Sequence, residues 1–419
     1  MKILILTNLY PPHFLGGYEL KCSLHAEQLR DKGHEVYVLT SCWKAEADKV
    51  TDGVYRLLKF NTFEEPPSRK GSPLDPFRLS RRYQQLRWAL ACRKNYSITR
   101  KFVVDLKPDV GFIWNMGEIG ITPILAIQKQ KIPLVFRLGD YWLADLKYTL
   151  CLQPNQLRRI YNAAILGLYD FSELDLSRLL VVSRALMQHY VALGFPEQTI
   201  TVIPNGVPAK FILHAFDLNG HLSAHAKINL VQVNRIDPKK GVHIAIQALA
   251  KLVNEKGYSN LHLDIIGKGS NPYTQQLKTL CASLGLNAHI SFIGFLEHQH
   301  LLERLPDYTA MVLPSLWEEP LAGVIAESMA RGVPVIASHC GGSTEIISHG
   351  ENGLLVPPGD PNKLADAIEQ LIQDPALVQK IRYAGLETVR EHYTHEPLMD
   401  QIESQLQEAY LAYQSPQLE

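Results

Sequence analysis

Residues 1–40 read MKILILTNLY PPHFLGGYEL KCSLHAEQLR DKGHEVYVLT, and this stretch decides the fold class. An apolar run at residues 3–7 predicts a buried first β-strand, and residues 18–32 have the spacing of an amphipathic helix. Gly33 follows as the expected C-cap glycine, and an apolar run at 35–40 predicts the next strand. A strand, a helix and a second strand joined this closely are typical of a parallel sheet that helices cover on both faces.

The same alternation continues along the chain and restarts once. Further strands are expected at 110–114, 134–138, 179–182, 228–233, 261–266, 289–292, 310–313 and 333–337. The segment around 209–227 is polar and without periodicity, which is typical of a linker. We therefore predict the α/β class, with one doubly wound domain at 1–208, a linker at 209–227, a second doubly wound domain at 228–396, and a helix at 397–419 that packs back on the first domain. Ligands of such sheets bind at the carboxyl ends of the strands, so we expect a site in a cleft between the two sheets.

Composition excludes several classes of protein. Of the 419 residues, 46% are hydrophobic and 20% are charged, as in ordinary globular chains. Lys plus Arg and Asp plus Glu both number 42, so nothing favours nucleic acid as a partner. The six cysteines are dispersed and form no CxxC pair, and no apolar run approaches the roughly 20 residues that span a bilayer. We expect a cytoplasmic protein.

Two glutamates follow the expected strand at 310–313. Glu319 lies in the loop, and Glu327 lies more than one turn inside a helix that begins near Ala322. Carboxylates accept hydrogen bonds from vicinal hydroxyls, so the pair suits a ribose or a hexose. Taken alone, two such glutamates are more often a solvated loop residue and an ordinary helix residue.

Two loops have features of phosphate-binding sites. Arg235 and Lys240 lie in the polar loop after the first strand of the second half, where a guanidinium and an ammonium suit a diphosphate. Gly16 and Gly17 precede the first helix, and paired glycines there let a phosphate or a sugar approach the backbone. Taken singly, each loop is also an ordinary polar turn. The glycines do not form GxGxxG, which disfavours a dehydrogenase.

Residues 68–101 contain ten Lys and Arg residues against Asp75 as the only acid. Apolar residues are interspersed, so one interpretation is a basic amphipathic helix that contacts an anionic membrane or a lipid-diphosphate acceptor. The simpler interpretation is a solvated helix whose apolar side packs on the first sheet, and basic stretches of this kind are common on surfaces.

Together these motifs resemble the retaining glycosyltransferases of family four, which have the GT-B fold of two Rossmann-like domains. The resemblance lies in YPP-x-x-GG-E at 10–19, R-x4-KG at 235–241, the glycine turn at 266–269, the paired glutamates, and GG-x-x-E at 341–345. It implies that the catalytic residues are Glu319, Arg235, Lys240 and Asp140. It implies that the donor contacts Gly16, Gly17, Arg235, Lys240, Gly267, Gly294, Phe295, Leu321, Ala322, Gly323 and Glu327.

The resemblance also implies an activity. A sugar would move with retention from a UDP-, GDP-, ADP- or dTDP-sugar to a glycan, lipid-linked or small-molecule acceptor. The domain at 1–208 would bind the acceptor and that at 228–396 the donor. No DxD-like pair lies in a loop that suits Mg²⁺, so we expect no metal, and no cofactor besides the co-substrate. The alternative is a catalytically silent, nucleotide-sugar-binding subunit of a glycosyltransferase complex.

Two motifs depart from the family pattern. Residues 137–142, RLGDYW, resemble an H-D-Y-W loop, but Gly139 replaces the histidine that usually lies near the transferred sugar. Asp140 remains the candidate side chain of that loop. Pro320 and Ala322 depart from the usual E-G-F-G-L, which should change the backbone N–H groups offered to the donor sugar.

Overall fold

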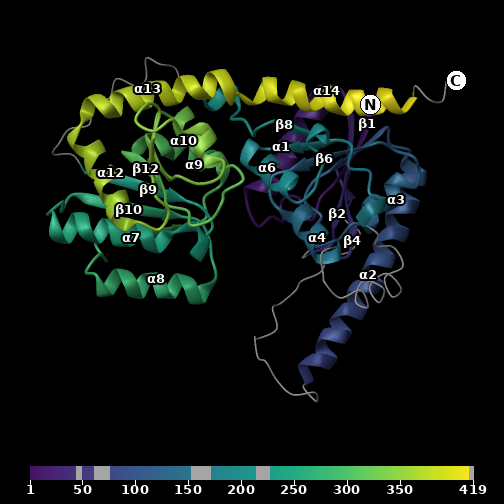
Figure 1. The fold of residues 1–419 in the computed structure, drawn as a ribbon, viewed down its shortest axis with the longest axis horizontal. Coiled ribbons are helices and arrows are strands. Elements are labelled where there is room, and N and C mark those ends of the chain that lie inside the picture. Colours follow the sequence, from purple (N-terminus) through teal and green to yellow (C-terminus); the bar gives the residue numbers. More distant parts are fainter. Residues whose placement is uncertain (44–49, 61–75, 152–170, 214–226, 415–419) are drawn as a thin grey trace. The chain divides into compact units, whose positions relative to one another are not determined.

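The computed structural model describes residues 1–43, 50–60, 76–151, 171–213 and 227–414, with the backbone alone for 76–89 and 148–151. The chain folds into two compact units (Figure 1). The first unit consists of Met1–Val182, Met187–Ile203 and Met399–Glu419, and the second of Ser183–Leu186 and Pro204–Leu398.

The first unit contains an eight-stranded sheet in the order β3-β4-β2-β1-β5-β6-β7-β8. Its strands are β1 (Lys2–Leu6), β2 (Glu35–Ser41), β3 (Val50–Thr51), β4 (Val54–Leu58), β5 (Val110–Ile113), β6 (Leu134–Leu138), β7 (Leu179–Val181) and β8 (Ile200–Val202). All neighbours are parallel except β3 and β4, which are antiparallel. Strands β5 and β6 are buried along their whole length, as expected where helices cover both faces of a parallel sheet.

The helices of this unit follow the strands as the periodicity predicts. They are α1 (Gly17–Asp31), α2 (Pro76–Leu106), α3 (Thr122–Gln128), α4 (Trp142–Cys151) and most of α6 (Arg184–Ala192). Helix α1 ends as expected: Gly33 has φ +85°, its N–H donates to Arg30 O at 2.8 Å, and His34 N donates to Leu29 O at 3.0 Å. The long helix α2 (blue in Figure 1) packs against α3.

The C-terminal helix α14 (His395–Gln414) contributes residues 399–414 to the first unit. Glu403 accepts hydrogen bonds from Lys32 Nζ at 2.9 Å and from His34 Nε2 at 2.8 Å. Arg178 and Glu408 form a further ion pair at 3.4 Å. The end of the chain is therefore attached by charge to residues around the start of β2 and β7.

The second unit contains a six-stranded, all-parallel sheet in the order β11-β10-β9-β12-β13-β14. Its strands are β9 (Ile228–Val233), β10 (Leu261–Ile266), β11 (Ile290–Gly294), β12 (Ala310–Leu313), β13 (Val335–Ser338) and β14 (Leu354–Val356). Its helices are α7 (Val242–Ala250), α8 (Asn271–Ser283), α9 (His298–Arg304), α10 (Gly323–Ala330), α11 (Ser343–Ile346), α12 (Pro361–Gln373) and α13 (Pro375–His392). One buried cluster joins α7, α8 and α12 to one face of the sheet, and another joins α9 and α10 to the opposite face (Figure 1). This strand order is the Rossmann order.

The structure confirms the fold class, and the expected strands lie within two residues of the observed ends. Four short strands were not predicted: β3, β4, β8 and β14. Residues from Pro204 onward lie in the second unit up to Leu398, and Val207 N donates there to Tyr393 O at 2.8 Å. Most of the expected linker, 214–226, lies outside the described residues, as does 68–75 of the basic stretch.

Candidate functional site

In the second unit, the loops that follow β9 and β12 are packed against each other. The two strands are neighbours in the sheet, so their carboxyl ends open at one edge. Leu316 N donates to Lys239 O at 2.8 Å, and a Cβ on Gly241 would lie 1.8 Å from Pro314 O. Gly241 also has φ +66°, so both its conformation and this close approach require glycine. The contact brings the two sequence-predicted loops together.

The centre of this site is an ion pair between Lys240 and Glu319. Lys240 Nζ lies 2.6 Å from Glu319 Oε1 and 2.8 Å from Oε2, and Ser315 Oγ donates to Oε1 at 2.7 Å. The side chains are only 15% and 5% exposed. A carboxylate this buried requires a partner charge and hydrogen bonds, and Lys240 and Ser315 supply them. The Lys240 ammonium also lies 5.0 Å from the centroid of the Trp317 ring.

Gly341 and Gly342 hold the Glu319 segment from the side of β13. A Cβ on Gly341 would lie 2.3 Å from Glu319 O, and one on Gly342 would lie 2.2 Å from Pro320 O. Gly342 N donates to Glu319 O at 2.7 Å. The close packing of this glycine pair thus fixes the backbone position of Glu319.

Gly267 and Gly294 end the neighbouring strands β10 and β11 and are hydrogen-bonded to each other. Gly267 N donates to Gly294 O at 2.8 Å, and a Cβ on Gly267 would lie 1.8 Å from Asn234 O. Phe295 follows with 39% of its surface exposed and with Lys268 Nζ 5.3 Å from its ring centroid. The side-chain amide atoms of Asn234 are buried and have no hydrogen-bond partner among the described residues.

The first turn of α10 completes the edge. Ala322 is the N-cap in extended conformation, and no side chain caps the helix. Leu321, Ala322 and Gly323 are half-buried. Glu327 lies one turn further, and its Oε1 is 3.0 Å from Nε2 of His298, the first residue of α9. The Glu327 side chain is 8% exposed, so this carboxylate also has a partner.

Arg235 is an exposed cation of the site. It lies in the same loop as Lys240, but its guanidinium has no hydrogen bond or ion pair among the residues that the structure describes. The structure therefore places Arg235 and Lys240 on one loop without bringing their side chains into contact with a common group. A free guanidinium on this loop is available to an anion.

In the first unit, the ends of three adjacent strands are joined by a chain of polar side chains. Asn8 Nδ2 donates to Asn115 Oδ1 at 2.8 Å, and Asn115 Nδ2 donates to Asp140 Oδ2 at 2.6 Å. Trp142 N donates to the other Asp140 oxygen at 3.2 Å. Burial raises the pKa of Asp140 to about 6, against the opposing effect of the hydrogen bonds from Trp142 and Asn115.

Tyr18 lies against the glycine of the same loop. Its hydroxyl donates to Arg137 O and accepts from Gly139 N at 3.3 Å. A Cβ on Gly139 would lie 2.3 Å from Tyr18 Cε2, so the tyrosine ring fills the space in front of this position. Trp114 packs edge-on against Tyr18 with ring centroids 5.3 Å apart.

Gly16 and Gly17 begin α1 without a neighbour that requires glycine. Gly16 is extended, with φ −164°, and its N–H donates to Glu19 Oε2 at 3.0 Å in a capping box. A Cβ on either glycine would meet nothing within 4 Å. The space beside this backbone is therefore open within the described part of the unit.

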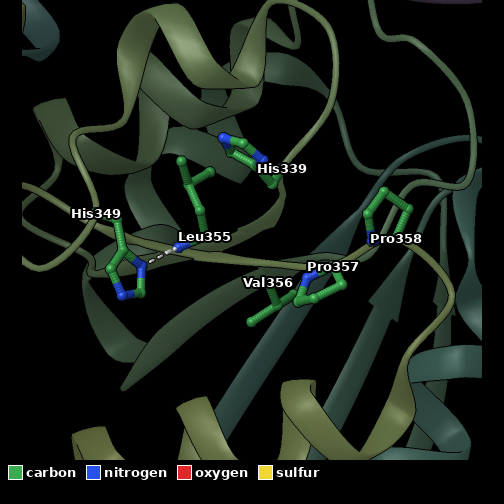
Figure 2. A pocket seen from close by; sticks show the side chains of 6 residues that line it. All are labelled: His339, His349, Leu355, Val356, Pro357 and Pro358. Atoms are coloured by element: carbon green, nitrogen blue, oxygen red, sulfur yellow. Dashed lines mark hydrogen bonds between the residues drawn. The ribbon is translucent and has the colours of Figure 1, made fainter.

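A cavity of about 410 Å³ opens at the ends of β13 and β14. Figure 2 shows its lining, in which His349 Nδ1 accepts a hydrogen bond from Leu355 N at 3.0 Å. The other lining residues are His339, Val356, Pro357 and Pro358. None of the residues predicted for the site lines this cavity.

Among the described residues, no group of three or more His, Cys, Asp or Glu side chains is placed to hold a metal ion. In the described ranges, no helix has the length and apolar character needed to span a membrane.

Sequence reasoning missed four side chains that the structure places at these sites: Ser315, His298, Asn115 and Tyr18. Ser315 precedes Glu319 by four residues, and His298 opens the helix after Phe295, so both lay close to recognised motifs. Asn115 directly follows an expected strand, and a polar residue at a strand end could have been predicted as a site residue. Nothing local pairs Tyr18 with residue 139.

Two Rossmann-like sheets, with glycine-lined backbone and charged side chains at their strand ends, define the class of GT-B glycosyltransferases. The profile of Glycosyltransferase Family 4 matches residues 16–211, and that of Glycosyl transferases group 1 matches residues 216–388. The chain belongs to glycosyltransferase family four.

Relatives and solved structures agree with this assignment. An uncharacterized glycosyltransferase of Methanocaldococcus jannaschii is 26% identical over 415 residues, which cover 94% of this chain and 95% of the relative. A glycogen synthase of Mycobacterium tuberculosis is 27% identical over 400 residues, with 91% and 88% covered. The crystal structure of Anabaena HepE with UDP-glucose superposes with a TM-score of 0.69 at 22% identity, covering 97% of this chain and 99% of that one.

Proposed function

We propose that this chain transfers a sugar, with retention of configuration and without a metal ion, from a nucleotide-diphosphate sugar to a glycan, lipid-linked or small-molecule acceptor. The observation that carries the proposal is the buried Lys240–Glu319 pair, which lies beside tightly packed glycine loops at the carboxyl edge of the second sheet. Anabaena HepE, with a similar fold, binds UDP and UDP-glucose, so UDP-sugars are the first donors to test.

The donor would bind along this edge. Arg235 offers an unpaired guanidinium to the diphosphate, and Lys240 has a third N–H besides the two that bond Glu319. The carboxylate of Glu319 keeps lone pairs for the hydroxyls of the transferred sugar. Glu327 accepts from the ribose, Phe295 stacks on the base, and the uncapped N–H groups after Ala322 face the sugar.

In the reaction, the bond between the anomeric carbon and the diphosphate oxygen breaks, and the electron pair leaves with the diphosphate. The acceptor oxygen bonds to the anomeric carbon from the same face, and its proton passes to an oxygen of the leaving phosphate. The negative charge that develops on the diphosphate is stabilised by Arg235 and Lys240, which are already in place before the reaction. These two cations do the work that Mg²⁺ performs in other transferases.

The first unit would supply the acceptor side. Gly16 and Gly17 present open backbone, and Asp140 is fixed at the strand ends by Asn115 and Trp142. Because Asp140 is anchored, its carboxylate has a defined position for a hydroxyl of the acceptor or of the donor sugar.

The test is binding followed by turnover. Purified full-length protein is titrated with UDP, GDP, ADP and dTDP by calorimetry, and the Glu327→Gln and Arg235→Ala variants are compared with Glu351→Gln, an exposed glutamate outside the site. We expect one nucleotide to bind, and both site variants but not the control to lose affinity about tenfold or more. Absence of binding by every nucleotide would refute the donor assignment.

Turnover separates the remaining parts of the proposal. The anomeric configuration of the product, measured by NMR, tests retention, and inversion would refute it. Activity that survives EDTA supports metal independence, and its loss would refute that part. Nucleotide-sugar binding without hydrolysis or transfer to any acceptor would identify the alternative, a silent binding subunit.

A further inference from the structure

A second cavity, of about 530 Å³, lies in the first unit between α2 and the end of β4. Lys94, Lys101, Phe102 and Asp105 line it from α2, at spacings that place them along one face of the helix. Arg56 and Leu57 of β4, together with Cys42 and Lys59, form the opposite wall. None of the residues assigned to sugar transfer above contributes to this cavity.

The walls of the cavity are fixed by contacts between the helix and the strand. Phe102 packs edge-on against Tyr55 with ring centroids 4.6 Å apart. The buried Asn95 accepts from Lys59 N at 2.7 Å and donates to Lys59 O at 3.0 Å. Lys59 also lines the cavity, so its position relative to α2 is set by these two hydrogen bonds. The cavity is therefore preformed.

The lining carries an excess of positive charge. Arg56, Lys59, Lys94 and Lys101 face one acid, Asp105, which gives four positive charges and one negative. Lys94 and Lys101 form no ion pair among the described residues, and both are exposed. Four cations that converge on one cavity favour a ligand with more than one negative charge, because a single carboxylate would leave most of the repulsion uncompensated.

Two aromatic residues directly follow lining residues of the cavity in the chain. Cys42 and Lys59 line it, and the residues that follow them, Trp43 and Phe60, have ring centroids 5.7 Å apart. Both rings are half-buried. Aromatic rings pack against the apolar C–H faces of sugars, so this ring pair would suit a saccharide attached to an anion that the cavity binds.

One lining residue also contacts the loop that precedes α1. The Arg56 guanidinium lines it and at the same time donates to Tyr10 O at 3.0 Å and to Pro11 O. These carbonyls belong to the loop that leads to Gly16 and Gly17. A ligand held in the cavity is therefore close to the loop that we assign to the transfer site.

We propose that this cavity binds the phosphate or diphosphate of a phosphorylated saccharide acceptor, whose sugar ring packs on Trp43 and Phe60. That the bound saccharide is an acceptor rests on the proposed transferase function. The phosphate-binding site itself does not depend on that function. The same phosphate chemistry occurs in free sugar phosphates and in lipid-linked diphosphate sugars.

The experiment measures binding of glucose 1-phosphate, inorganic pyrophosphate, glucose, glucuronate and a farnesyl diphosphate glucoside to the full chain by calorimetry. The cavity variant is Lys94→Glu with Lys101→Glu. Its matched control is Arg93→Glu with Arg100→Glu, which reverses two charges on the same helix at the same spacing outside the cavity lining. Thermal unfolding confirms that both variants fold.

We expect glucose 1-phosphate to bind, glucose not to, and the cavity variant to lose affinity about tenfold or more while the control loses less than about twofold. Trp43→Ala should weaken the binding of glucose 1-phosphate but not the binding of pyrophosphate. If the farnesyl diphosphate glucoside binds more tightly than glucose 1-phosphate, the ligand is a lipid-linked diphosphate sugar. If the two bind equally, the ligand is a free sugar phosphate. Equal affinity for glucuronate, no effect of the cavity variant, or binding only to vesicles of phosphatidylglycerol would each overturn the proposal.

A second readout separates this inference from the proposed function. Arg235→Ala removes a cation of the donor site and should weaken nucleotide binding about tenfold or more while leaving sugar-phosphate binding in place. The cavity variant should bind the nucleotide as the unmodified protein does and should lose affinity for the sugar phosphate. If sugar-phosphate binding is lost with Arg235→Ala and survives in the cavity variant, the phosphate binds at the donor site and the cavity proposal fails.

Discussion

The ring of Tyr18 occupies the space that a side chain at position 139 would need. A Cβ on Gly139 would lie 2.3 Å from Cε2 and 2.7 Å from Cδ2 of this ring, and the two residues are also joined by the Gly139 N–H to the Tyr18 hydroxyl at 3.3 Å. Position 139, where the family resemblance led us to expect a histidine, is therefore closed from within the same unit. Glycine here and tyrosine on α1 form one complementary pair.

Gly139→Ala should destabilise the first unit by about 1–3 kcal/mol, because the added methyl group overlaps a packed ring. In a Tyr18→Ser background the same substitution should cost much less. The double-mutant cycle is measured by chemical denaturation, with Gly16→Ala as a control expected within about 0.5 kcal/mol. Equal costs in the two backgrounds would show that Tyr18 is not the obstacle.

Lys240→Met leaves the Glu319 carboxylate, which is 5% exposed, with Ser315 as its hydrogen-bond donor. We expect the second unit to lose about 3 kcal/mol at neutral pH, since removing one partner of a buried pair leaves an uncompensated charge. Adding Glu319→Gln should restore much of this loss. Lys363→Met is the control, because Lys363 pairs with Asp366 at 3.4 Å with both side chains more than half exposed. It should change stability by less than about 0.5 kcal/mol.

The first unit should become less stable as the pH rises from about 4 to about 6 through the titration of Asp140. The folded pKa of about 6 exceeds the ordinary value of 3.8, so the folded state binds the proton more tightly in this window. Ionisation in the folded state then costs at most about 3 kcal/mol, and the loss is complete above the folded pKa. Asp140→Asn should flatten this part of the stability profile, measured by denaturation at several pH values. An unchanged slope would assign the dependence to other groups.

Phe295→Ala should weaken nucleotide binding about tenfold without lowering the melting temperature of the free protein. The ring is 39% exposed, so its loss opens no internal cavity, while stacking on a base contributes on the order of 1–3 kcal/mol. Tyr383→Ala on α13, where the ring is 55% exposed, is the matched control. Comparable affinity in the two variants would place the base elsewhere.

The strands and helices that were predicted correctly have features that a short stretch of sequence contains. Strands such as β5 and β6 are buried on both faces and therefore appear as continuous apolar runs, and α1 ends where Gly33 has positive φ. The missed strands β8 and β14 have three residues each and lie at the sheet edges. Three residues contain too little periodicity to distinguish a strand from a loop.

Sequence by itself determined the α/β class, the two Rossmann-like halves and the candidate residues at the strand ends, because burial, helix periodicity and glycine turns are local properties of the chain. Only the tertiary structure decided which of those residues meet. Lys240 and Glu319 are 79 positions apart and come together because β9 and β12 are neighbours in the sheet. Tyr18 and Gly139, 121 positions apart, meet because the first turn of α1 contacts the end of β6 through the Tyr18 hydroxyl. Such pairs depend on strand order and on close packing across the sheet, which no local pattern contains.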